Sequence, residues 1–89
     1  MSEQEETLLE FPCEFSVKAM GLATDNFDTV VVEIVRRHVP ELGEGAVKTR
    51  PSKEGKYLSV TVTFDATSKA QLDAIYQDLT DHDQVLMSL

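Results

Sequence analysis

The clearest pattern of polar and apolar positions along the chain lies at residues 57–64, with the sequence YLSVTVTF. Apolar and polar side chains alternate strictly there, and the apolar set is Leu58, Val60, Val62 and Phe64. A period of two residues is typical of a strand with one buried face. We therefore predict a central strand whose other face, formed by tyrosine, serine and threonine, meets solvent.

Toward the N-terminus, the same alternation recurs at residues 13–20, which we predict to be the first strand, ending at Gly21. A helical period follows between residues 27 and 38. Thr24 is the expected N-cap of this helix, and Pro40 cannot continue it. The prediction is a strand followed by an amphipathic helix that ends near His38.

The second half of the chain begins with a short predicted strand at residues 46–50. Its connection to the central strand contains Gly55, which can adopt the positive φ that hairpin turns often need. A second amphipathic helix is predicted from an N-cap at Thr67 to about residue 80. Last comes a short strand at residues 85–89, with its inward side chains expected to be Val85, Met87 and Leu89.

The predicted order is β-α-β-β-α-β, and right-handed crossovers place both helices on one face of a four-stranded antiparallel sheet. This is an α+β two-layer sandwich of the ferredoxin-like type. The first and central strands lie in the middle of the sheet, and the other face stays open. The open face is predicted to carry Ser16, Lys18, Met20, Lys48, Arg50, Tyr57, Ser59, Thr61 and Thr63.

Length and charge limit the classes of function. The 89 residues suffice for one domain, which we place at residues 8–89 after a disordered acidic lead-in at residues 1–7. A formal net charge of −8 disfavours binding to nucleic acid and to anionic membranes. The single cysteine, Cys13, cannot form an intrachain disulfide, and the chain has no apparent targeting or membrane segment. We expect a cytoplasmic protein.

Several stretches of the chain are distinctive. They are residues 8–12 (LLEFP), 18–21 (KAMG), 31–40 (VVEIVRRHVP) and 65–67 (DAT), and the hairpin with Pro51, Gly55 and Tyr57. Together they resemble the YbeD-like family of small uncharacterised bacterial proteins. The resemblance covers nearly the whole chain. It implies an α/β sandwich similar to the ACT domains that regulate enzymes of amino-acid metabolism, and it implies no established ligand.

The residues needed for the chemistries of related folds are missing. The loop after the first strand, residues 20–24, has neither the arginine of acylphosphatases nor the cysteine pair of copper carriers. The open face lacks the aromatic platform of RNA-recognition domains. His38 is expected to stabilise a helix C-terminus, and His82 to lie in a solvated turn. We therefore expect no enzyme activity, no cofactor and no metal site.

One candidate binding site is the junction between the first strand and the first helix. The free amides of a helix N-terminus can bind an anion. The predicted ligand-binding residues are Met20, Gly21, Leu22, Thr24 and Asp25. An ordinary capped turn is the alternative interpretation of this junction.

The other candidate site is the hairpin, which holds four of the eight basic residues of an otherwise acidic chain. The predicted partner-binding residues are Lys48, Arg50, Lys53, Lys56 and Tyr57. Such a positive surface would attract an acidic patch of a protein or a small anionic metabolite. A charged sheet edge that prevents aggregation is the alternative.

Two functions remain open from the sequence. One is a non-catalytic regulatory module that senses a small ligand or acts on a metabolic enzyme or other partner protein. The other is a structural or adaptor protein that binds a partner through its edge strands and open face. Short edge strands also allow a weak homodimer.

Overall fold

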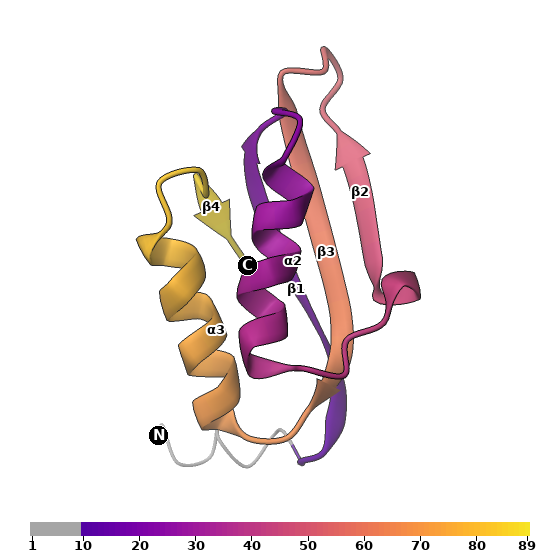
Figure 1. Ribbon diagram of the computed structural model, residues 1–89, viewed down its shortest axis with the longest axis vertical. Helices are drawn as coiled ribbons and strands as arrows, with labels where there is room; N and C mark the ends of the chain where they lie inside the picture. Colours follow the sequence, from indigo (N-terminus) through magenta and orange to yellow (C-terminus); the bar gives the residue numbers. More distant parts are fainter. Residues whose placement is uncertain (1–9) are drawn as a thin grey trace.

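A computed structural model describes residues 10–89, apart from the side chain of Glu44. The predicted lead-in at residues 1–7 lies outside the described residues. Four strands form one antiparallel sheet in the order β2-β3-β1-β4, and both helices cover one of its faces (Figure 1). The order of elements along the chain is β-α-β-β-α-β, so the predicted ferredoxin-like sandwich is confirmed.

The two long strands form the centre of the sheet. β1 (Cys13–Leu22) pairs with β3 (Tyr57–Ala66) over the full length of both strands, from Cys13 opposite Ala66 to Leu22 opposite Tyr57. β2 (Val47–Pro51) pairs with the other side of β3. The hairpin between them turns at Gly55, whose φ of 78° confirms the predicted positive-φ position.

The helices bury one apolar stripe each. α2 (Phe27–His38) contributes Phe27, Val31, Ile34 and Val35, and α3 (Lys69–Asp81) contributes Leu72, Ile75 and Leu79. These side chains pack on Val17, Ala19, Val60 and Val62 of the central strands to form the core. Within residues 10–89, neither helix combines the length and the hydropathy that a membrane crossing requires.

Both predicted N-caps are wrong, because each helix starts one or two residues later than the sequence suggests. α2 begins after Asn26, and the Thr24 hydroxyl donates a hydrogen bond to Asn26 Oδ1 (3.1 Å) instead of capping the helix. The cap of α3 is Ser68, whose Oγ accepts a hydrogen bond from the Gln71 amide (3.0 Å). Thr67 directly precedes it, and its own amide donates to Gln71 Oε1 (2.8 Å).

The orientation predicted for the last strand is wrong for Met87 and Leu89, whereas Val85 packs against the core as predicted. β4 (Met87–Ser88) follows an irregular turn, and Met87 lies opposite Met20 of β1. Because Met20 faces away from the helices, Met87 does too, and 53% of its surface is exposed. Leu89, which exchanges two backbone hydrogen bonds with Lys18, is 66% exposed. The C-terminal residues therefore add apolar side chains to the open face.

Candidate functional site

The open face of the sheet is hollowed beside β2. One hollow of about 440 Å³ lies at the end of the hairpin, and its lining residues are Met20, Arg50, Pro51, Ser52, Lys53, Tyr57 and Ser59. A second, of about 360 Å³, is lined by Lys18, Lys48, Thr49, Arg50, Ser59 and Thr61. Arg50 and Ser59 line both hollows, which therefore adjoin. We call the two together the basic groove.

The strand register explains how the basic residues come together. Lys48 and Lys18 both lie opposite Thr61, one from β2 and the other from β1, and Arg50 lies opposite Ser59. Residues two apart on a strand share a face, so Lys48 and Arg50 point the same way. The pairing thus gathers side chains from three strands on the open face.

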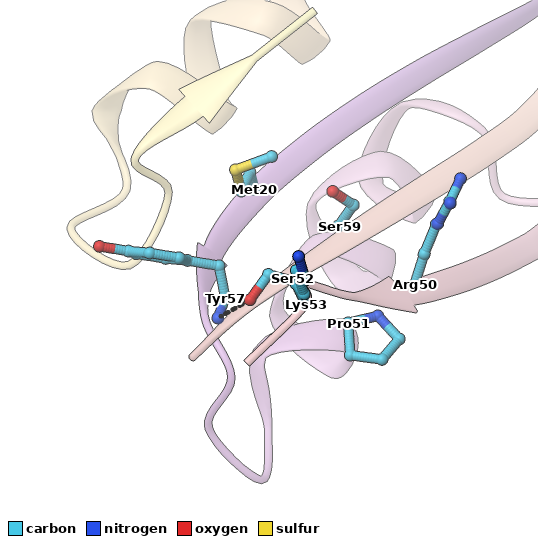
Figure 2. Close-up of a pocket in the computed structure, with 7 residues that line it drawn as sticks. All are labelled: Met20, Arg50, Pro51, Ser52, Lys53, Tyr57 and Ser59. Atoms are coloured by element: carbon cyan, nitrogen blue, oxygen red, sulfur yellow. Dashed lines mark hydrogen bonds between the residues drawn. The ribbon is translucent and has the colours of Figure 1, made fainter. Parts of the chain in front are cut away.

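Side chains at the tip of the hairpin complete the groove. The Ser52 hydroxyl accepts a hydrogen bond from the Tyr57 amide (3.0 Å), which holds the start of the tip against β3. In Figure 2, Met20, Ser59 and Arg50 come from three neighbouring strands, and the Tyr57 ring points away from Arg50. Lys56 places its ammonium group 5.4 Å from the centre of the Tyr57 ring.

The described side chains that line the groove carry a single sign of charge. Among the residues that the structure describes, the charged side chains of the groove are Lys18, Lys48, Arg50 and Lys53, and none of the described carboxylates lines either hollow. By contrast, the hollow between α2 and β2 on the other face is lined by Asp28 and Glu33 as well as Arg36. The acidic residues Glu14 and Asp65, which lie opposite each other, belong to the far ends of β1 and β3. Positive potential is therefore concentrated on one part of the open face.

The ligand-binding residues predicted at the strand–helix junction do not share one surface. Met20 lines the basic groove, whereas Gly21 faces the helices. A Cβ at Gly21 would collide with the Gln84 carbonyl oxygen and with the ring of Phe27, so this position is closely packed. Leu22, Thr24 and Asp25 are exposed.

A polar cluster occupies the start of α2. The Gln84 side chain donates hydrogen bonds to Thr24 Oγ1 (3.3 Å) and Asn26 Oδ1 (3.4 Å), which links the turn before β4 to this junction. An anion site here stays a prediction, and the close packing supports the alternative of an ordinary turn.

The partner-binding residues predicted in the hairpin are closer together. Arg50, Lys53 and Tyr57 line the first hollow, Lys48 lines the second, and Lys56 lies over the Tyr57 ring. Sequence reasoning left Lys18, Ser52 and Ser59 out of the site. Lys18 and Ser59 were already expected on the open face, but their proximity to Lys48 and Arg50 depends on the strand register.

Both histidines form hydrogen bonds outside the basic groove. His38 Nε2 lies 2.7 Å from Asp78 Oδ2 and so joins α2 to α3 on the helical side of the molecule. His82 Nδ1 accepts a hydrogen bond from the Gln84 amide (3.1 Å). Among residues 10–89, no three His, Cys, Asp or Glu side chains form a group that could hold a metal ion.

The fold and the sequence together define the kind of protein. The computed structure resembles the solution structure of protein HP0495 from H. pylori, with a TM-score of 0.68 over 91% of this chain and 85% of that one. The sequence identity between the two is only 18%, so this likeness concerns the fold. The protein is a small ferredoxin-like α+β protein.

Sequence comparison then gives the family. Residues 6–89 match the family model described as "Protein of unknown function (DUF493)". A UPF0250 protein of Chromobacterium violaceum is 47% identical over the full length of both chains. UPF0250 protein NE1487 of Nitrosomonas europaea is 44% identical over 96% of this chain and 98% of that protein. The chain belongs to this family, and the YbeD-like resemblance is confirmed.

Proposed function

We propose that the protein is a non-catalytic regulatory module that binds an acidic surface of a partner protein in the basic groove. The observation that carries this proposal is the contrast of charge. The chain has a net charge of −8, yet its described residues direct four basic side chains, and no acidic one, into two adjoining hollows. Exposed like charges repel one another slightly, so such a cluster has no evident benefit for stability.

The shape of the groove also supports a macromolecular partner. Sites for small molecules usually bury most of the ligand in a concave, largely apolar pocket. Here the hollows lie on an open sheet face and are lined mainly by basic and hydroxyl-bearing side chains. A carboxylate in the groove would gain charge-assisted hydrogen bonds from Arg50, while its protein would cover the surface around it.

We describe the module as non-catalytic because no described nucleophile in the groove has a histidine or carboxylate base beside it. A thiol or hydroxyl nucleophile needs a base within hydrogen-bond reach. Cys13 is partly buried at the start of β1. His38 is hydrogen-bonded to Asp78, and His82 accepts a hydrogen bond from the Gln84 amide. None of these groups lines the basic groove. The hydroxyls that do line it, on Ser52, Ser59 and Thr61, have no histidine or carboxylate beside them among the described lining residues.

The test is affinity capture from the native cell with identification by mass spectrometry. The tagged full-length chain is compared with K48Q/R50Q, which removes two positive charges from the groove. The matched control is R36Q/R37Q, which removes two exposed charges from α2 on the other side of the molecule. We expect one set of partners to be retained by the wild-type and control chains and lost from K48Q/R50Q.

A different pattern would support another function. Partners retained equally by all three chains would contradict the proposal and favour an adaptor that uses its edge strands. A small anionic metabolite would use the same positive charges, so inorganic phosphate serves as a probe for it. Phosphate should leave the melting temperature unchanged if the groove requires a protein surface. If phosphate raises the melting temperature of the wild-type protein but not that of K48Q/R50Q, the groove is a site for a small anion.

A further inference from the structure

The open face changes in chemistry from one edge to the other along two parallel rows. The first row is Arg50, Ser59, Met20 and Met87, in which each residue lies opposite the next on the neighbouring strand. The second row is Lys48, Thr61, Lys18 and Leu89, closed by the backbone hydrogen bonds between Lys18 and Leu89. Each row begins with a basic residue on β2 and passes a hydroxyl on β3. On β1 the first row has Met20 and the second has Lys18, and each row ends with a large apolar side chain at the β4 edge.

The apolar ends of these rows are exposed to solvent. Met87 and Leu89, which we call the apolar edge, are 53% and 66% exposed. Met20 lies beside Met87 and also lines the basic groove, so the apolar and basic surfaces are continuous. In Figure 2, β4 lies on the side of Met20 away from Arg50. Contiguous exposed apolar side chains commonly mark an interaction surface.

The hydroxyls between the two ends are available for hydrogen bonds. Ser16 and Thr63, nearer the other end of the sheet, satisfy each other with their oxygens 2.8 Å apart. Ser59 and Thr61 have no side-chain hydrogen bond to any described residue. An extended peptide has free amides and carbonyls to offer such hydroxyls, whereas a helix satisfies its backbone internally.

We infer that the groove and the apolar edge together bind one extended segment of a partner protein, with an acidic residue followed or preceded by a large apolar one. This inference rests on the proposed function and specifies the chemistry of the partner. The acidic side chain would lie against Arg50 and Lys48. The apolar side chain would lie against Met20, Met87 and Leu89, and the backbone between them would cross Ser59 and Thr61.

The width of the sheet sets the spacing in such a segment. From β2 to β4 there are three strand intervals, about 14 Å in total at roughly 4.8 Å each. An extended chain advances about 3.4 Å per residue, so the acidic and apolar side chains should be separated by about four positions. This spacing distinguishes a segment that crosses the strands from one that only touches the basic groove.

The experiment uses the full-length protein and fluorescent synthetic peptides. One peptide has a pair of glutamates, a spacer of about three serines and a pair of leucines, so that the nearest glutamate and leucine lie about four positions apart. The others replace the leucines with serine or omit the spacer. Binding is followed by fluorescence anisotropy with the wild-type protein, M87S/L89S and K48Q/R50Q. The control is Leu86→Ser, since Leu86 is also exposed but belongs to neither row.

We expect the leucines of the peptide to raise its affinity only when the apolar edge of the protein is intact. The complete peptide should bind the wild-type protein about tenfold more tightly than the leucine-free peptide, as expected for partial burial of the leucines. M87S/L89S should abolish that difference and leave affinity for the leucine-free peptide unchanged, whereas Leu86→Ser should change neither. Omitting the spacer should remove most of the leucine contribution.

Other results separate the two proposals. If all peptides bind with equal affinity and K48Q/R50Q weakens them alike, the groove binds anions and the inference about the apolar edge is wrong. If no acidic peptide binds to the groove, the proposed function is wrong as well. Light scattering serves as the second measurement. A wild-type dimer that K48Q/R50Q or M87S/L89S dissociates would make a second copy the occupant and would overturn the inference of a foreign segment.

Discussion

Arg50 and Met20 lie opposite the same residue, Ser59, from the two sides of β3. A guanidinium group and a thioether therefore border one hydroxyl on the open face, and all three line the same hollow. This arrangement joins the basic groove to the apolar edge within the width of a few strands. The two surfaces can act on one partner because the strand register makes them neighbours.

The salt dependence of binding follows from the charge of the groove. The affinity of the wild-type protein for a glutamate-rich peptide should fall as the salt concentration rises, because the basic side chains of the groove are exposed and salt screens their charges. K48Q/R50Q should bind more weakly at low salt and show a shallower dependence. Anisotropy titrations over a salt series measure both effects. An equal salt dependence in the two proteins would mean that the peptide binds elsewhere.

Gly21→Ala tests the close packing at the strand–helix junction. A Cβ there would meet the Gln84 carbonyl oxygen and the Phe27 ring, so the free energy of unfolding should fall by about 1–3 kcal/mol. Gly43→Ala is the control, since its Cβ would have no atom within 4 Å and its φ is not positive. That variant should stay within about 0.5 kcal/mol of the wild type. Urea denaturation measures both, and equal values would refute the packing argument.

The N-cap of α3 can be tested with a pair of neighbouring hydroxyls. Ser68→Ala removes the side chain that accepts from the Gln71 amide and should cost about 1 kcal/mol. Thr67→Ala leaves the hydrogen bond from the Thr67 amide to Gln71 Oε1 in place and should change stability by less than about 0.5 kcal/mol. Thermal denaturation of the two variants ranks them. If Thr67→Ala is the more destabilising of the two, Thr67 is the cap and the assignment of Ser68 is wrong.

The sequence predicted most of the fold because the long strands and the helix stripes carry a strong periodic signal. Residues 57–64 alternate without interruption, and their register with β1 follows from two long strands that must both bury one face. The sequence does not fix the start of α3, because Thr67 and Ser68 both carry a hydroxyl that can accept a hydrogen bond from an amide of the first turn. Only the backbone geometry selects Ser68.

The last strand shows where the pattern was insufficient. Leu86 and Met87 are adjacent apolar residues, so either alternation fits the C-terminal stretch. The pairing of Met87 with Met20 fixes the orientation, and no local signal reports that pairing. For the same reason the sequence placed Lys48 and Arg50 on the open face but could not show that Lys18 lines the same hollow.

The central claim is that the basic groove, and not the start of α2, is where an acidic partner binds. Amide chemical-shift mapping by NMR, with a glutamate-rich peptide added to the full-length protein, tests it most directly. We predict shifts at Lys18, Met20, Arg50, Ser59 and Thr61, with residues 24–29 unaffected. Shifts confined to residues 24–29 would contradict the account and assign anion binding to the strand–helix junction.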